Sequence, residues 1–222
     1  PALCIHYPMS DRLMLFMDTG ATADPKPDIL EQFAQMGAIY AEKVMGLERP
    51  RIGLLANGEE EEKGTMVLRE TFTLLEQSSL NFVGNVEPKE AVKGYADVVV
   101  TDGFTGNIHI KTAEAVASFL KRAIQSDLLT GVLPVAAGIL LLPALVVGLP
   151  GLLLLLPRIR RLIKRMDYAE VGGALLLGVN GVVIVGHGRS NARAVRSAIL
   201  RAREAVAGDV IPTIKTELLG NG

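Results

Sequence analysis

The residues best suited to chemistry lie in the stretch TDGFTGN, residues 101–107, which combines two glycines with hydroxyl, carboxylate and amide side chains. It follows the apolar run ADVVV, residues 96–100, and precedes a stretch with helical spacing of apolar residues, so it should join a buried strand to a helix. Glycines at such a junction let the backbone approach a ligand, and the free N–H groups of a helix N-terminus attract an anion. A tight turn with a helix N-cap would use the same residue types, and that alternative stays open.

Three other loops have a similar composition and are expected at the same edge of a sheet. They are DTGATADPKP at residues 18–27, NGEEEEKG at 57–64 and GHGRSNA at 186–192. The loops lack the glycine spacing of dinucleotide-binding and P-loop motifs, and the sequence has no Gly-x-Ser-x-Gly elbow of a serine hydrolase. The sequence therefore indicates a site for a small anion, in which the substrate itself supplies the nucleophile.

The elements that must position these loops follow from the hydrophobic pattern. Apolar runs predict strands at residues 12–17, 51–56, 81–86, 96–100 and 181–185. Helical spacing predicts helices at residues 27–45, 65–77 and 87–94, another that ends near residue 124, and one after the GHGRSNA loop. Apolar strands that alternate with helices indicate a mostly parallel sheet covered on both faces, in which ligands bind at the carboxyl ends of the strands.

The composition excludes several classes of function. The 222 residues include 23 Lys and Arg against 24 Asp and Glu, a net charge of −1, so the basic excess typical of nucleic-acid-binding proteins is absent. The single cysteine, Cys4, excludes an internal disulfide and a CxxC motif, and the three histidines have no metal-ligand spacing. We expect a cytoplasmic protein that uses no metal and no cofactor.

The assembled motifs resemble the phosphate acyltransferase (PlsX) family of bacterial phospholipid synthesis. The matching stretches, in the family's order, are DTGATADPKPDILEQFAQMGAIYAEKVMG, PRIGLLANGEEEEKG, NFVGNVE, ADVVVTDGFTGNIHIKTAEA and MDYAEVGGALLLGVNGVVIVGHGRSNARAVRSAI. The resemblance implies a Rossmann-like three-layer α/β/α fold with a mostly parallel sheet, related to phosphotransacetylases and usually a homodimer. It also implies transfer of a fatty acyl group from acyl-acyl-carrier protein to inorganic phosphate, which gives acyl phosphate for phospholipid synthesis.

The resemblance assigns the family's essential lysine to Lys63 and its essential asparagine to Asn107. When phosphate attacks a thioester, an oxyanion forms beside an anionic nucleophile. The lysine would offset this charge, and the amide would hold the phosphate or the oxyanion. For Lys63, the alternative is a solvated side chain paired with the neighbouring carboxylates of residues 59–62.

Seven further residues are expected to contact the substrates. They are Asp18, Gly20, Asp102, Gly103, Thr105, Gly106 and His187. The two carboxylates could instead orient Lys63 or Asn107, or cap a turn or a helix, and the backbone could satisfy His187. Thr22 and Ala56 stand where the family usually has Asn.

The family's amino-terminal portion has no counterpart in this chain. Residues 1–222 therefore resemble the carboxyl-terminal two-thirds of a single α/β catalytic domain. Residues before Pro1 would contribute strands and loops to the same sheet, so we expect this chain alone to be inactive or poorly soluble.

An apolar block without charged residues lies between Asp127 and Arg158, and the basic stretch RIRRLIKR, residues 158–165, follows it. Family members have helices here that protrude and touch the membrane. We therefore expect residues 128–165 to form a protruding apolar helical insertion that attaches the protein peripherally to the cell membrane. Four prolines interrupt the block, and a buried helical hairpin or dimer interface is the alternative. Membrane attachment would suit hand-off of the product to a membrane acyl-phosphate:glycerol-3-phosphate acyltransferase.

Two other functions remain open for this sequence. A short-chain phosphotransacylase that acts on acyl-CoA would use the same fold, but the long apolar block has no purpose for short acyl groups. A non-catalytic membrane-docking scaffold is favoured by Thr22, Ala56 and the missing amino-terminal portion.

Overall fold

The computed structural model describes residues 1–8, 12–128, 148, 151, 153–158, 173–188 and 190–219. The chain divides into two compact units, one formed by Pro1–Asn107 with Tyr168–Gly222 and the other by Ile108–Asp167. The predicted insertion at residues 128–165 falls within the second unit and lies mostly outside the described residues, so it stays a prediction. Within the described ranges, no helix has both the length and the apolar character needed to cross a membrane.

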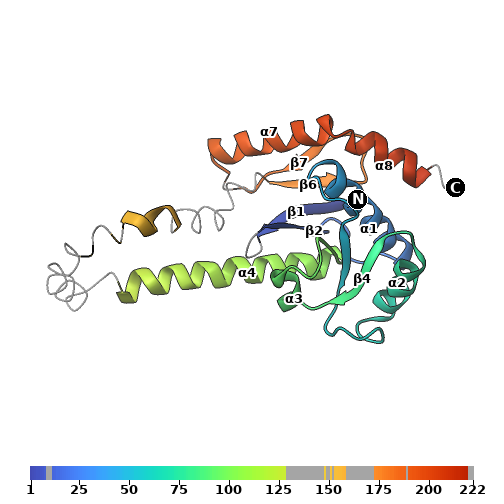
Figure 1. Ribbon diagram of the computed structural model, residues 1–222, viewed down its shortest axis with the longest axis horizontal. Coiled ribbons are helices and arrows are strands. Elements are labelled where there is room, and N and C mark those ends of the chain that lie inside the picture. The colour runs from blue at the N-terminus through green and yellow to red at the C-terminus, as the bar shows by residue number, and fades with distance from the viewer. Residues whose placement is uncertain are drawn as a thin grey trace. The chain divides into compact units, whose positions relative to one another are not determined.

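The described part of the first unit forms a seven-stranded sheet in the order β4-β3-β5-β2-β1-β6-β7 (Figure 1). The strands are β1 (Ala2–Pro8), β2 (Leu13–Met17), β3 (Arg51–Leu55), β4 (Asn81–Val86), β5 (Val98–Val100), β6 (Ala174–Leu177) and β7 (Val183–Val185). Strands β4, β3, β5 and β2 pair in parallel, whereas β1 pairs antiparallel with β2 and β6, and β6 pairs antiparallel with β7. Only β1 and β7 therefore run against the other strands, which confirms the predicted mostly parallel sheet.

The described helices follow the predicted order. They are α1 (Pro27–Lys43), α2 (Met66–Gln77), α3 (Pro88–Lys93), α4 (Gly103–Ala123), which continues as the π-helix η1 (Ile124–Leu128), α7 (Ala192–Ala207) and α8 (Val210–Leu219). Helices α1 and α3 begin with proline, whose fixed φ suits the first helical position. Thr65 and Asn191 cap α2 and α7, because their side-chain oxygens accept from the backbone N–H groups of Leu68 and Ala194.

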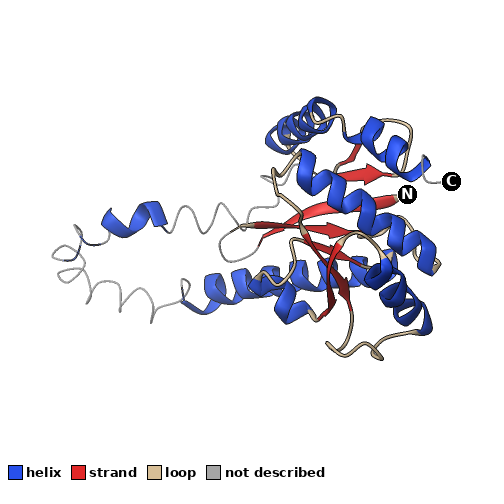
Figure 2. Cartoon of the chain, turned by 45° about the vertical axis from the view of Figure 1, so that its right-hand side comes forward, coloured by secondary structure: helices blue, strands red, loops and turns tan. Residues whose placement is uncertain are grey.

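Apolar side chains form a core cluster on each face of the sheet. Helices lie on both sides of the sheet (Figure 2). The larger cluster packs the strands against α1, α2 and α8, and its fully buried members include Met17, Leu54 and Leu75. A smaller cluster on the opposite face joins Phe16 and Val99 to Ala91 of α3. Because β2, β5 and β3 are buried on both faces, their sequences are continuous apolar runs without a period of two.

Helix α4 begins at Gly103, within the stretch that the sequence pattern placed in a loop. A Cβ atom on Gly106 would overlap with the backbone carbonyl oxygen of Asp18, and one on Gly103 would come within 2.8 Å of the Thr22 carbonyl oxygen. The two glycines therefore let the first turn of α4 pack directly on the loop that follows β2. This packing explains the absence of side chains at both positions.

Gly106→Ala tests this packing. In an open helix the change would raise stability by about 1 kcal/mol. Here we expect it to lower the free energy of unfolding by about 1–3 kcal/mol, because the new methyl group forces the helix away from Asp18. Urea unfolding followed by circular dichroism measures the change. Thr105→Ala, at an exposed position of the same turn, should stay within about 0.5 kcal/mol of the unchanged chain. A more stable Gly106→Ala variant would contradict the assignment.

Candidate functional site

The carboxyl ends of three neighbouring strands form the candidate site. Val100 of β5 pairs with Leu54 of β3 on one side and with Met17 of β2 on the other. The three strands run in parallel and end at the same level, so the loops at residues 18–26, 56–65 and 101–102 leave the same edge of the sheet. The sequence placed these loops together correctly.

The fourth predicted loop, which carries His187, does not share this edge. Strand β7 runs opposite to β2, and its last residue, Val185, pairs with Ala174, the first residue of β6. The chain therefore leaves β7 towards the amino ends of the parallel strands, where the His187 side chain is exposed. The prediction that all four loops meet is wrong at this point. Only five residues, 178–182, connect β6 to β7, and so short a connection requires an antiparallel hairpin.

The Asp18 carboxylate organises the loop after β2. Asp18 is fully buried and adopts a left-handed backbone conformation, with a φ of 64°. Its Oδ1 accepts from the backbone N–H groups of Leu3 (3.2 Å), Gly20 (3.0 Å) and Ala21 (2.8 Å), and its Oδ2 accepts from Thr22 (2.9 Å). This carboxylate therefore holds the loop in place, and we assign it a positioning role instead of direct contact with a substrate.

Asn107 lies against this loop from the first turns of α4. A Cβ atom on Gly20 would lie 3.8 Å from the Cβ and Cγ atoms of Asn107, so Gly20 lies next to the Asn107 side chain. The Asn107 side chain is half-buried, and its amide has no hydrogen-bond partner among the described residues. Its donor and acceptor atoms are therefore available to a ligand.

The amino end of α4 is already largely satisfied by the protein. Asp102 Oδ1 accepts from the N–H of Thr105 at 2.7 Å, and the Asp102 carbonyl accepts from Gly106 at 2.9 Å. The N–H of Gly103 donates to the Thr22 carbonyl at 2.8 Å. These bonds favour the helix-capping alternative for Asp102, and they argue against an anion held mainly by the first N–H groups of α4.

Lys63 lies on the neighbouring loop, between β3 and α2. Its side chain is exposed, and among the described residues no carboxylate lies within ion-pair distance of its ammonium group. The alternative in which Lys63 pairs with the carboxylates of residues 59–62 is therefore not what the structure shows. Lys63 lies two residues before Thr65, which caps the amino end of α2.

A cluster of three carboxylates lies beside this loop. Oxygen atoms of Glu59, Glu87 and Glu90 all lie within 4.8 Å of one another, a spacing that a metal ion could bridge. The Lys89 ammonium contacts Glu87 and lies 3.9 Å from Glu90, and the Lys93 ammonium lies 3.4 Å from Glu90. Lysine side chains therefore supply the positive charge that these carboxylates require.

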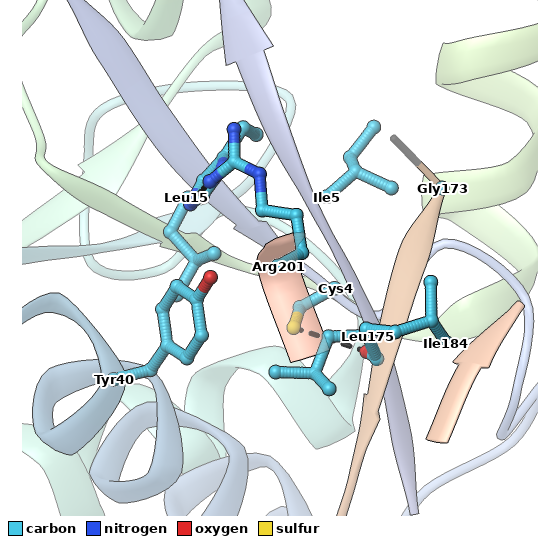
Figure 3. Close-up of a pocket in the computed structure, with 9 residues that line it drawn as sticks. Cys4, Ile5, Leu15, Tyr40, Gly173, Leu175, Ile184 and Arg201 are labelled. Atoms are coloured by element: carbon cyan, nitrogen blue, oxygen red, sulfur yellow. Dashed lines mark hydrogen bonds between the residues drawn. The ribbon is translucent and has the colours of Figure 1, made fainter. Parts of the chain in front are cut away.

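A small cavity lies away from the candidate site, between the sheet and helices α1 and α7 (Figure 3). Its volume of about 10 Å³ holds at most one water molecule. Cys4 donates from Sγ to the Leu175 carbonyl at 3.1 Å, and Arg201 lies 3.3 Å from His6 Nε2. Burial raises the pKa of Cys4 to about 12, so its thiol stays protonated and is a poor nucleophile. Burial, assisted by the Arg201 charge, lowers the pKa of His6 to about 3.

Asp18→Asn tests the organising role of the carboxylate. Asparagine also tolerates a left-handed conformation, so the backbone can stay as it is. In the variant, however, the amide NH₂ group takes the place of one carboxylate oxygen. This donor then faces a backbone N–H group, which is also a donor. We expect the free energy of unfolding to fall by about 2–4 kcal/mol in urea titrations. Asp24→Asn, at an exposed position of the same loop, is the matched control. Equal stability of the two variants would contradict this role.

The buried His6 predicts a pH dependence of stability. Between its ordinary pKa of 6.5 and the folded value of about 3, the unfolded chain binds the proton and the folded chain does not. The free energy of unfolding must therefore fall as the pH falls below about 6.5, by at most about 1.4 kcal/mol per pH unit. His6→Gln removes this contribution, so between pH 7 and 5 the variant should lose about 2 kcal/mol less than the unchanged chain. Parallel pH profiles of the two chains would refute a neutral, buried His6.

Comparisons with known proteins agree with this architecture. A family model described as "Fatty acid synthesis protein" matches residues 1–213. Curated phosphate acyltransferases from Anoxybacillus flavithermus and a Geobacillus species are 45% and 47% identical over 98% and 93% of this chain. These matches cover 62% and 59% of the two relatives, so the chain spans about three-fifths of their length.

A solved structure supports the fold. The branched-chain phosphotransacylase from Enterococcus faecalis aligns with a TM-score of 0.50 over 92% of this chain and 64% of its own, at 16% sequence identity. This similarity confirms the predicted relation of the fold to phosphotransacylases. The family match rests on sequence and extends over nearly the whole chain: the chain belongs to the phosphate acyltransferase (PlsX) family of fatty acid synthesis proteins.

Proposed function

We propose that this chain carries the reactive edge of a phosphate acyltransferase, which transfers an acyl group to inorganic phosphate. One observation carries the proposal. Lys63 lies on the loop after β3, and Asn107 lies in the first turns of α4, after the adjacent strand β5. Among the described residues, the Lys63 ammonium has no ion-pair partner and the Asn107 amide has no hydrogen-bond partner. A cation and an amide that the described residues leave free suit an anionic nucleophile and the oxyanion that it creates.

The proposed reaction is a direct displacement at a thioester. An oxygen of inorganic phosphate attacks the carbonyl carbon and forms a C–O bond, and the carbonyl electron pair moves onto its oxygen. When this tetrahedral intermediate collapses, the C–S bond breaks and the thiolate leaves with the electron pair. The products are an acyl phosphate and a free thiol. Lys63 offsets the charge of the phosphate, and Asn107 donates to the oxyanion or fixes the attacking phosphate.

The local structure supports attack by the substrate instead of by a protein nucleophile. The chain's cysteine is buried with a raised pKa, and the Asp18 carboxylate is occupied by backbone N–H groups. Thiolate is a good leaving group, so the site needs no strong general acid. The remaining requirement is positive charge and orientation, which Lys63 and Asn107 supply.

The proposal also names the acyl donor and the place of the protein in the cell. We take the donor as acyl-acyl-carrier protein and the product as acyl phosphate for phospholipid synthesis, in line with the names of the family model and the relatives. The apolar and basic composition of residues 128–165 supports peripheral attachment to the membrane. A cytoplasmic homodimer is the state that the family resemblance implies. From there the acyl phosphate would pass to a membrane acyl-phosphate:glycerol-3-phosphate acyltransferase.

Substitution of the two proposed catalytic residues tests the function. Lys63→Ala and Asn107→Ala should each lower the rate of acyl phosphate formation from acyl-acyl-carrier protein and phosphate by about a hundredfold or more, the scale for loss of one oxyanion partner. Trapping the product with hydroxylamine measures the rate. Lys43→Ala is the control and should keep the full rate. Lys43 is exposed and is the last residue of α1, whereas the loop of the candidate site precedes the first residue of α1. The rates are measured in the intact protein, because this chain alone is expected to be inactive. Full activity in both Lys63→Ala and Asn107→Ala would refute the assignment, and an unsubstituted intact protein without activity would support the scaffold alternative.

A further inference from the structure

Asn85 is a buried amide in β4 that the sequence pattern did not single out. Its side chain is 7% exposed, although it lies in a strand whose last residue, Val86, is apolar and buried. Its Nδ2 donates to the backbone carbonyl of Glu60 at 2.8 Å. Glu60 lies in the loop that carries Lys63, so the amide links β4 to the loop after β3.

The Glu60 carbonyl accepts a second hydrogen bond, from the backbone N–H of Lys63 at 3.0 Å. This bond closes the turn Glu60–Lys63, and Asn85 fixes the same oxygen from the side of the sheet. The aliphatic part of Lys63 lies over Gly58, where an added Cβ atom would come within 2.7 Å of the Lys63 Cγ atom. Two features therefore hold the start of the lysine side chain. They are its contact with Gly58 and the Glu60 carbonyl, which accepts two hydrogen bonds.

A β-bulge places Asn85 in this position. Ile52 pairs with Phe82 and Leu54 pairs with Asn85, so β4 has one extra residue in this interval. Gly84, with a φ of 93°, lies within it. Without the extra residue, Leu54 would face Gly84, and the Asn85 side chain would point to the other face of the sheet. Bulges often redirect a side chain next to a functional site.

The amide also carries a cost that a purely structural residue would avoid. Asn85 Oδ1 is buried and has no hydrogen-bond partner among the described atoms. Turning the amide over would bring Oδ1 against the Glu60 carbonyl oxygen, so the observed orientation is the favourable one. A buried amide next to a bulge, with its donor on a loop carbonyl, fits a residue that holds this loop.

We propose that Asn85 is a positioning residue, which holds the Glu60–Lys63 turn so that the Lys63 ammonium meets the phosphate. The inference rests on the proposed function, because it assumes that Lys63 binds phosphate. Asn85 acts only through Lys63, and its removal therefore matters only while Lys63 is present. A residue that merely stabilised the fold would have the same effect in both backgrounds.

A double-mutant cycle on phosphate binding tests this. Titration of the ¹⁵N-labelled intact protein with inorganic phosphate, followed by NMR, gives the dissociation constants. We expect Lys63→Ala to weaken binding about tenfold and Asn85→Ala about fivefold, with no further loss when Asn85→Ala is added to Lys63→Ala. The Lys63 amide proton should also exchange faster with solvent in Asn85→Ala. Asn85→Leu, which keeps a similar size and removes the donor without adding charge, should match Asn85→Ala and serves if the alanine variant unfolds.

Asn81 supplies the matched control on the same strand. Its Nδ2 donates to the Arg49 carbonyl at 3.0 Å, an equivalent bond at the opposite end of β4. Asn81→Ala should leave phosphate binding and Lys63 amide exchange unchanged. If Lys63→Ala weakens binding but Asn85→Ala does not, or if their effects add, the positioning role is wrong and the proposed function stands. If Lys63→Ala leaves binding unchanged, the proposed role of Lys63 fails, and the role of Asn85 fails with it.

Discussion

One buried carboxylate organises the described edge of the sheet. A carboxylate removed from water needs compensation for its lost hydration, and Asp18 obtains it from four backbone N–H groups on two segments. Three of those donors are in the turn that Asp18 itself begins, and the fourth is in β1. The carboxylate therefore sets the path of the loop and ties it to the amino-terminal strand. The carbonyl groups of Asp18 and Thr22 then form the surface on which the glycines of α4 pack.

The lysine loop depends on a different device at the neighbouring strands. There, an uncharged amide crosses from β4 to a carbonyl of the loop after β3, and a bulge sets its direction. The two devices are independent in the chain and in the sheet, since one belongs to β2 and α4 and the other to β3 and β4. At this edge of the sheet, the buried Asp18 carboxylate thus holds the loop after β2. The Asn85 amide and a tight turn hold the loop after β3.

The sequence predicted the parallel part of the fold well, because buried parallel strands and amphipathic helices have strong patterns. The strands at residues 13–17, 51–55 and 81–86 and the helices α1 and α2 lie close to their expected bounds. The prediction failed for the strands whose direction and pairing depend on contacts between distant parts of the chain. Strand β1 includes His6 and ends in Pro8, so it lacked the expected apolar run, and β6 was missed within a continuous apolar stretch. Because β6 was missed, the antiparallel hairpin of β6 and β7 was not predicted. This hairpin places His187 away from the candidate site.

For the site residues too, the sequence predicted their location but not their contacts. Glycine, acid and amide in TDGFTGN were correctly associated with the functional edge, but their roles depend on partners far away in sequence. Nothing in the local pattern shows that Gly106 meets Asp18, or that Asn85 meets Glu60. Lys63 and Asn107 gained their roles from the family resemblance, and the structure adds that neither side chain is engaged by described protein partners.

The environment of Cys4 has a consequence for a protein that handles activated acyl groups as proposed above. Thioesters exchange readily with thiolates, so a reactive cysteine near such a substrate would accept the acyl chain itself and leave a dead-end modification. The chain has only one cysteine. It is buried in β1, donates to the Leu175 carbonyl and has a pKa of about 12. The fold thus protects this cysteine from acylation.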